Sequence, residues 1–263
     1  MSKINVAVAG VRGRMGSAIV SAFPSNPAFN MIGGFSRSSS SGMDGLIDRA
    51  TALETADVIL DFTVGSAAAD LAEVCATRGG PALVIGATGF DAADLEKVRL
   101  ASRHLPIVRS GNFSIGINYL LGLVTRVAKD FGPDVWDIEI LEAHHRHKLD
   151  VPSGTALMLG EAAALGRGVP LSSVEAHNRS GPTGERTMGE IGFAAIRGGG
   201  IVGEHSVVFA APEEVITLSH SALDRGMFAR GALAAARWVI DQEPGEYSMQ
   251  DVLGFSPAGN RSD

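Results

Sequence analysis

Short apolar runs alternate with stretches of helical periodicity through the first part of the chain. The runs are too short for buried helices and are rich in Val and Ile, which favours strands. Between them, apolar residues recur three and four positions apart, as on the buried side of a helix. We predict helices after the first, third and fourth of the following strands: 4–9, 30–35, 58–62, 82–85 and 107–108.

This alternation predicts an α/β fold, a Rossmann-like doubly wound parallel sheet over residues 1–114. Such sheets bind ligands in the crevice at the carboxyl ends of their strands. Loops 61–63, 86–89 and 110–113 follow three of the predicted strands and are polar or glycine-bearing. We expect them to line a cofactor crevice.

The pattern changes from residue 115, where longer helical stretches and closely spaced strands follow. Strands separated by short turns pair mostly antiparallel. We therefore predict a second, α+β domain over 115–224 with a mainly antiparallel sheet, whose outer face could be covered by another subunit. Its predicted elements are helices from 119 to 129 and from 153 to about 165, and strands at 135–141, 192–196, 204–210 and 215–220. A last helix covers 227–242, and the tail after Pro244 is expected to be loosely structured.

The length of the chain allows two domains, and its composition is typical of globular proteins. The chain has 263 residues, of which 45% are apolar and 19% charged, and its net charge is −7 without a long charged run. We expect no nucleic acid and no membrane as partner. The only cysteine, Cys75, excludes an intrachain disulfide, and its helical spacing indicates a core position. With no signal segment and no apolar stretch of about 20 residues, we expect a soluble cytoplasmic protein.

A glycine-rich turn, GVRGRMG, follows the first strand at 10–16. Glycines there allow a tight turn and close approach of a pyrophosphate, although the spacing is GxxGxxG and not the commoner GxGxxG. The second strand ends at SRSSS, where NAD-binding proteins usually carry an acid. A serine beside Arg37 would suit a 2′-phosphate, so the sequence favours NADPH while leaving NADH open. The serine-rich segment could also be a loop that contacts no ligand.

The densest cluster of titratable and cationic side chains lies in EAHHRHKLDVPSGT, residues 142–155. Three histidines, an arginine and a lysine fall within five residues. A helix begins just after them, with Ser153 or Thr155 as its cap. Its N-terminus favours an anion, and imidazole and ammonium groups can transfer protons near neutral pH. We predict a pocket for a small acid.

Three other interpretations of this segment are weaker. A divalent metal would be repelled by Arg146 and Lys148. A solvated basic strand end would need no ligand at all. Nucleophilic catalysis by Ser153 requires a strand–turn–helix elbow with flanking glycines, which the sequence matches poorly.

The whole chain resembles the 4-hydroxy-tetrahydrodipicolinate reductases, or dihydrodipicolinate reductases, of the diaminopimelate route to lysine. The most specific motif is EAHHRHKLDVPSGTA, supported by VAGVRGRMG, IGATGF, GNFSIGIN and IVGEH. The resemblance implies reduction of 4-hydroxy-tetrahydrodipicolinate to tetrahydrodipicolinate by NADPH or NADH, with hydride added at C4 and water lost. It also implies a homotetramer assembled through the second-domain sheet, and a first domain completed by residues 225–263.

The resemblance further implies roles for individual residues. His144 and Lys148 would donate and accept protons, and His145, Gly154 and Thr155 would bind the dicarboxylate. The family often has an acid at the position of Ser36, and its absence here weakens any NADH preference. Cofactor contacts would come from Gly10, Val11, Arg12, Gly13, Arg14, Met15, Arg37, Gly86, Ala87, Thr88, Ser110, Gly111, Asn112 and Phe113.

Two functions of other classes compete with a reductase. A catalytically silent protein of the same fold could sense dinucleotides, but it would have no need for the histidine–lysine cluster. An aldehyde dehydrogenase would need a reactive cysteine in the crevice, and Cys75 on a helix does not supply one.

Overall fold

The computed structural model describes residues 3–36, 45–177, 179–224 and 226–255. Their contacts divide the chain into two units. The first combines Met1–Ile115 with Arg225–Asp263, and the second is Gly116–Asp224. The first unit is therefore built from two separate stretches of chain.

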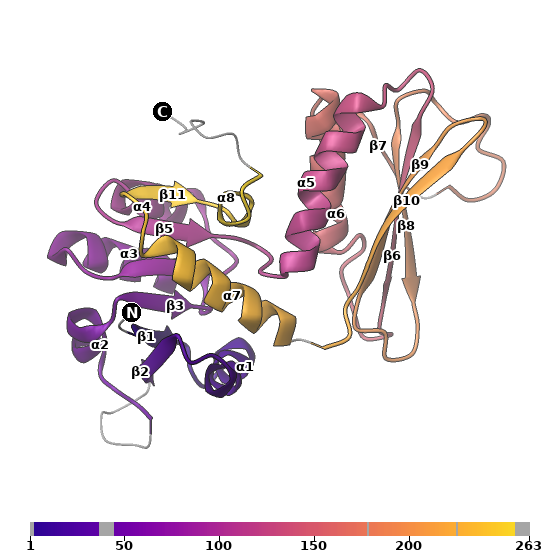
Figure 1. Cartoon of the computed structure of the whole chain (residues 1–263). Coiled ribbons are helices and arrows are strands. Elements are labelled where there is room, and N and C mark those ends of the chain that lie inside the picture. The colour runs from indigo at the N-terminus through magenta and orange to yellow at the C-terminus, as the bar shows by residue number, and fades with distance from the viewer. Residues whose placement is uncertain (1–2, 37–44, 178, 225, 256–263) are drawn as a thin grey trace. The chain divides into compact units, whose positions relative to one another are not determined.

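A six-stranded parallel sheet forms the centre of the first unit, as the apolar runs predicted (Figure 1). Its order is β11-β5-β4-β3-β1-β2, so the chain leaves β1 toward one edge and returns past it toward the other. This is the doubly wound topology, and it confirms the predicted fold class. The strands are β1 (Ile4–Ala9), β2 (Phe29–Phe35), β3 (Val58–Asp61), β4 (Ala82–Ile85), β5 (Pro106–Arg109) and β11 (Gly245–Tyr247).

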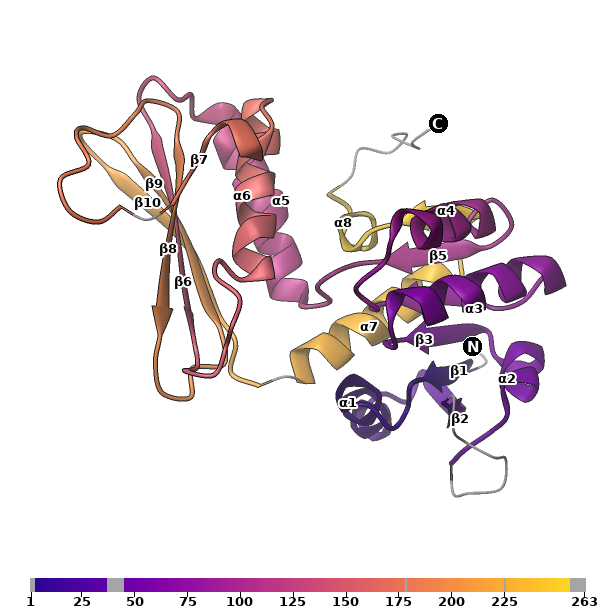
Figure 2. The same cartoon turned by 180° about the vertical axis from the view of Figure 1, so that it is seen from behind.

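Helices cover both faces of this sheet (Figures 1 and 2). On one face, Ile19 and a run of small residues from the last long helix pack on Val6 and Val8. On the other, helices rich in alanine pack on Ile59 and Leu83. The first face carries α1 (Arg14–Ala22) and α7 (Gly226–Val239), and the second carries α2 (Arg49–Thr55), α3 (Gly65–Arg78) and α4 (Ala92–Ala101); η1 (Phe23–Ser25) follows α1.

The segment after Pro244 differs from its prediction. The segment after Pro244 is ordered as far as residue 255, because β11 pairs with β5 and α8 (Met249–Val252) packs beside it. A three-residue edge strand is too short to show a periodic pattern, so the prediction of a loosely structured tail was wrong for these residues.

Cys75 is fully buried on α3, as its helical spacing predicted. Burial raises the pKa of its thiol to about 12.

The second unit packs two long helices on one face of a five-stranded sheet (Figures 1 and 2). Ile138, Ile140, Val207 and Phe209 point to the helices and form the core. The helices are α5 (Ile115–Asp130) and α6 (Gly154–Arg167), with η2 (Leu171–Ser173) after them. The strands are β6 (Asp137–His144), β7 (Glu175–Ala176), β8 (Ile191–Arg197), β9 (Glu204–Ala210) and β10 (Val215–Ser221).

This second sheet is mixed, although the short connections predicted mainly antiparallel pairing. Its order is β10-β9-β6-β8-β7, with β6 parallel to β8 and antiparallel to β9. The six residues 198–203 therefore do not close a hairpin between β8 and β9. They cross the end of β6, a gap of about 10 Å that an extended segment of this length can span.

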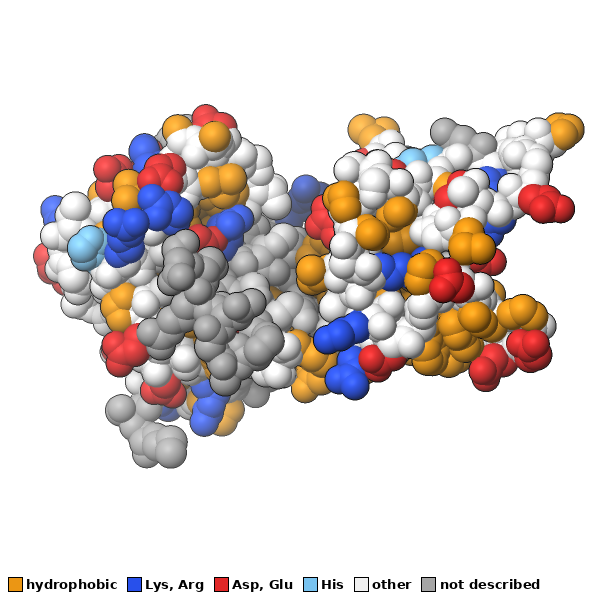
Figure 3. Space-filling model, turned by 90° about the horizontal axis from the view of Figure 1, so that it is seen from above, with side chains coloured by type: hydrophobic (Ala, Val, Ile, Leu, Met, Phe, Trp, Pro, Cys, Tyr) orange, Lys and Arg blue, Asp and Glu red, His pale blue; other side chains and the backbone are white. Residues whose placement is uncertain are grey.

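The other face of this sheet, which we call the open face, carries apolar side chains at the surface. Leu141, Ile196 and Val215 are 40%, 60% and 60% exposed and alternate along their strands with core positions. Hydrophobic side chains reach the surface among charged ones (Figure 3). Among the described residues, no helix combines the length and apolarity needed to cross a bilayer.

Candidate active site

Strand β6 brings two polar side chains of the histidine motif onto the helix-facing side of the second sheet. Glu142 and His144 are two residues apart, so their side chains share a face. In the sheet register, Glu142 lies opposite His205 on β9, and His144 lies opposite Arg197 on β8. The sequence placed the end of this strand at Leu141, but pairing with both neighbours extends it through His144.

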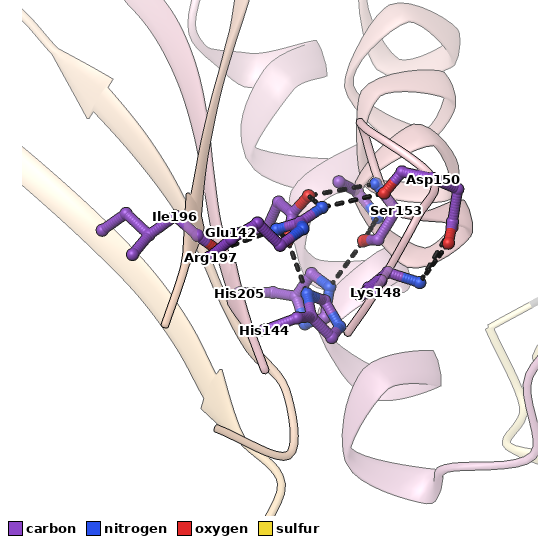
Figure 4. A network of polar contacts seen from close by, with 9 residues as sticks. Glu142, His144, Lys148, Asp150, Ser153, Ile196, Arg197 and His205 are labelled. Atoms are coloured by element: carbon purple, nitrogen blue, oxygen red, sulfur yellow. Dashed lines mark hydrogen bonds and ion pairs between the residues drawn. The ribbon is translucent and has the colours of Figure 1, made fainter. Parts of the chain in front are cut away.

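Glu142 is the centre of the resulting polar network (Figure 4). One carboxylate oxygen, Oε2, accepts hydrogen bonds from Nδ1 of His144 at 2.5 Å and from Nη1 of Arg197 at 2.8 Å. The other, Oε1, accepts from Nη2 of Arg197 at 2.6 Å and from the backbone N–H of Ser153 at 3.1 Å. The two oxygens thus have the donors that a buried carboxylate requires.

The partners of Glu142 keep its side chain charged although it is only 1% exposed. Burial alone would raise the pKa of Glu142, but the hydrogen bonds from Arg197 and His144 outweigh burial and lower the pKa below its ordinary value. In turn, the hydrogen bond to Glu142 raises the pKa of Arg197. Glu142 is therefore buried as a carboxylate, and the half-buried Arg197 faces it as a guanidinium.

A second histidine packs beside His144. The rings of His144 and His205 lie edge to face, with centroids 5.1 Å apart. Nε2 of His205 lies 3.0 Å from Oγ of Ser153. Burial, and then the charge of His144, lower the pKa of His205 to about 4, so this ring is neutral at neutral pH.

The loop between β6 and α6 carries the remaining basic groups. The N–H of Lys148 donates to the carbonyl of His145, and its ammonium group donates to both carboxylate oxygens of Asp150 at 2.8 and 2.9 Å. Arg197 donates to the carbonyl of Asp150 at 2.8 Å. The loop is thus attached to the Glu142 network, and Figure 4 shows Lys148 near His144 and His205.

The loop ends at the N-terminus of α6, where Ser153 and not Thr155 is the cap. Oγ of Ser153 accepts from the N–H of Ala156 at 3.2 Å. Gly154, which is exposed, and Thr155, which is half-buried, occupy the first turn. This places a helix N-terminus, which favours anions, next to the loop that carries Lys148.

In the first unit, four loops meet at the carboxyl edge of the parallel sheet. A Cβ on Gly10 would lie 2.8 Å from Cγ2 of Thr63, and one on Gly86 would lie 2.1 Å from the ring of Phe62. The ring of Phe62 in turn lies 5.2 Å from that of Phe113. The turns after β1, β3, β4 and β5 are therefore in contact with one another.

The glycine-rich turn allows the backbone of β1 and α1 to approach closely. Gly10 has φ +70°, which only glycine adopts readily. A Cβ on Gly16 would lie 2.3 Å from the carbonyl oxygen of Gly10. Gly13 begins α1 without a side-chain cap. The N-terminus of this helix therefore forms a cradle of backbone N–H groups at a tight glycine turn, which fits a pyrophosphate.

The two halves of the chain match two halves of one family. Residues 4–113 match the model described as "Dihydrodipicolinate reductase, N-terminus", and residues 116–253 match "Dihydrodipicolinate reductase, C-terminus". The chain belongs to the dihydrodipicolinate reductase family. The resemblance inferred from the sequence motifs is confirmed.

Individual relatives agree with this family membership. The 4-hydroxy-tetrahydrodipicolinate reductase of Caulobacter vibrioides is 53% identical over 252 residues, which cover 96% of this chain and 98% of the relative. That of Parvibaculum lavamentivorans is 46% identical over 268 residues, with coverage of 96% and 98%. The solved dipicolinate-bound dihydrodipicolinate reductase of Paenisporosarcina sp. TG-14 has a TM-score of 0.78 at 22% identity, covering 95% of this chain and 99% of that one, and shows the same fold.

In this member of the family, the predicted residues fall into two groups. His144, His145, Lys148, Gly154 and Thr155 share the end of β6, the following loop and the first turn of α6. The predicted cofactor residues, except one, lie in three of the loops at the carboxyl edge of the first sheet or, for Arg14 and Met15, in the first turn of α1. Arg37, the exception, lies outside the described residues.

Three members of the network received no predicted role, although His205 ends the IVGEH motif. Glu142 lies inside the motif, but nothing in its spacing indicated a buried acceptor for His144. Arg197 and His205 are distant in the chain and meet Glu142 only through the strand register. Because β6 lies between β8 and β9, a signal for these contacts would have required the strand order.

Proposed function

We propose that His144 and Lys148 transfer protons in this NAD(P)H-dependent reductase, which converts 4-hydroxy-tetrahydrodipicolinate to tetrahydrodipicolinate in lysine biosynthesis. The observation that carries this assignment is the grouping of an imidazole, an ammonium group and a helix N-terminus in one unit. A cation and a helix N-terminus suit a dicarboxylate, and His144 can exchange a proton.

The substrate is proposed to bind at the N-terminus of α6. A reductase of similar fold has been solved with dipicolinate bound. Here, Gly154 and Thr155 would direct backbone N–H groups at one carboxylate, and His145 would donate a hydrogen bond. The ammonium group of Lys148 would leave Asp150 for the substrate. Asp150 is the exposed partner of that ion pair, so this exchange needs no buried contact to break.

When bound, the reduced nicotinamide would supply the hydride for C4, and the hydroxyl group of the substrate would leave as water. The role of His144 or Lys148 is to protonate that departing hydroxyl. The cradle formed by Gly10, Gly13 and Gly16 would hold the pyrophosphate, with Val11, Arg12, Arg14 and Met15 around it. Gly86, Ala87, Thr88, Ser110, Gly111, Asn112 and Phe113 would complete the site, and Arg37 would favour NADPH over NADH.

We also propose a homotetramer that buries the open face of the second sheet. The apolar residues at its surface support this assembly, because sheet faces of this kind are usually covered. A cytoplasmic location is proposed from the cysteine usage alone.

Steady-state oxidation of NADPH and NADH, with the freshly made product of the preceding synthase as substrate, tests the activity. The variant His144→Ala with Lys148→Ala should lower kcat by roughly 10²–10⁴-fold, the usual contribution of general acid–base groups. NAD(P)H affinity should be unchanged, because neither side chain is proposed to contact the cofactor. Near-normal turnover in the double variant would contradict the assignment. Tight cofactor binding without turnover in the wild type would favour a dinucleotide sensor.

A further inference from the structure

We infer that Glu142 and Arg197 are positioning residues, which together fix the tautomer and orientation of His144 and hold the loop that carries Lys148. This inference rests on the proposed role of His144 in proton transfer. It concerns two residues that do not themselves contact the substrate.

The tautomer of His144 follows from the state of Glu142. A carboxylate accepts hydrogen bonds and cannot donate one. Because the pKa of Glu142 is lowered, Nδ1 of His144 must carry the hydrogen of the 2.5 Å contact. Proton exchange with a substrate is then restricted to Nε2.

The surroundings of Nε2 agree with this assignment. A Cβ on Gly203 would lie 3.1 Å from Nε2 of His144, so a side chain at this position would crowd the nitrogen that is to exchange the proton. His205 does not compete for the carboxylate, because its Nε2 bonds to Ser153 and burial lowers its pKa. Of the two edge-to-face rings, His144 is the one that hydrogen-bonds to Glu142.

Arg197 has two tasks in this arrangement. It donates to both oxygens of Glu142, which compensates a carboxylate that would otherwise be costly to bury. It also donates to the carbonyl of Asp150, whose side chain binds Lys148. One guanidinium thus connects the two residues that we propose to transfer protons.

The substitution Glu142→Gln distinguishes positioning from simple packing, because it retains size and removes one acceptor. Two fixed donors, the N–H of Ser153 and Nη2 of Arg197, point at the Oε1 position, whereas only one, Nη1 of Arg197, points at Oε2. The remaining amide oxygen should therefore take the Oε1 position. The amide NH₂ would then face Nδ1 of His144, which can accept only if its hydrogen moves to Nε2. The ring would change tautomer without leaving its place.

We expect Glu142→Gln to lower kcat by about 100-fold, within the range of general acid–base contributions. The KM for NADPH should change little. Two-bond ¹H–¹⁵N NMR spectra, assigned with a His144→Gln variant, should show hydrogen on Nδ1 in the wild type and on Nε2 in Glu142→Gln. A kcat within threefold of wild type together with an unchanged tautomer would overturn the inference. If the wild type itself lacks turnover, the proposed function fails, whereas the spectra still test the tautomer.

Glu139→Gln is the matched control. Glu139 is on the same strand, pairs with Arg179 and Arg186, and lies on the opposite face. Its substitution should leave kcat and the His144 tautomer unchanged. If it lowers kcat as much as Glu142→Gln does, loss of any Glu–Arg pair on β6 explains the effect and the inference fails.

Glu142→Gln could also fail to fold, since it leaves Arg197 without its carboxylate. The double variant Glu142→Gln with Arg197→Met removes both charges of the pair, and replacing both partners of an ion pair is often tolerated. It should regain stability while kcat remains low and Nδ1 of His144 no longer shows fixed protonation. Recovery of kcat together with stability would show that the pair only supports packing, which would overturn the inference.

Discussion

His205 shows how a single buried residue couples stability to pH. Its pKa is lowered to about 4, first by burial and then by His144, His220 and Lys148, while Glu142 opposes the shift. In the unfolded chain, the ring takes up its proton near the ordinary value of 6.5. Between these values the unfolded chain binds more protons. The stabilisation is therefore complete above about pH 6.5 and is lost as pH falls toward 4.

We predict that the wild type loses about 2 kcal/mol more stability between pH 7 and pH 5 than a His205→Gln variant does. Urea unfolding curves at the two pH values measure the difference. If the wild type and His205→Gln lose equal amounts of stability, His205 is not the residue that takes up a proton on unfolding.

At the residue scale, the sequence identified groups that share a short segment and missed those that meet through the sheet. The cluster from His144 to Lys148 was found because its density stands out in the chain. Arg197 is one arginine among several, and only the pairing of β6 with β8 places it opposite His144. The role of Arg37 in binding a 2′-phosphate stays a prediction, because this residue lies outside the described part of the chain.

At the scale of elements, the caps of α6 and α4 offer a comparison. Oγ of Ser153 caps α6 and also contacts the buried His205, whereas Asp91 caps α4 through a capping box with the N–H of Asp94. Loss of an N-cap costs about 1 kcal/mol. Loss of Ser153 should cost more, because it also removes the hydrogen-bond partner of Nε2 of His205.

We predict that Ser153→Ala accelerates amide exchange in the first turn of α6 more than Asp91→Ala does in α4. Hydrogen exchange followed by mass spectrometry measures the exchange rates of both helices, of which α4 lies in the first unit and α6 in the second. Asp91→Ala should leave turnover unchanged, since α4 carries none of the proposed site residues. Equal acceleration in the two helices would mean that the contact between Ser153 and His205 adds nothing to the cap.

Element boundaries were predictable where one face of an element is buried and uncertain elsewhere. The strand 204–210 alternates between core and surface and was predicted with its observed bounds. Strand β6 was predicted over 135–141 but runs over Asp137–His144. Its end was missed because the last positions hold Glu142 and His144, which are polar but are buried by pairing on both sides. Strand β11 has three residues and showed no pattern.

At the scale of the whole molecule, the proposed tetramer predicts a mass of four times the 27.3 kDa chain. Charges introduced by Ile196→Asp with Val215→Asp should lower that mass, because both side chains lie on the open face. Light scattering after gel filtration measures it. Leu223→Asp, at a residue 88% exposed and outside the strands, should leave the mass unchanged. A wild-type mass of one chain would contradict the tetramer.

The sequence predicted both sheets and the fold class, because the period and length of the apolar runs indicate the type of each element and which of its side chains are buried. The order of strands in the second sheet was not predictable from connection length alone. A six-residue connection can close a hairpin or cross one strand, and only the pairing of β6 with both β8 and β9 decides between them.

The first unit needs residues from both ends of the chain. The carbonyl oxygen of Phe113, in the loop after β5, would lie 1.7 Å from a Cβ on Gly231 of α7, and β11 completes the sheet beside β5. During translation, residues 116–224 emerge before these pieces do. All residues of the second unit are therefore synthesised before the first unit is complete, and one face of the first sheet stays partly uncovered until α7 has been made.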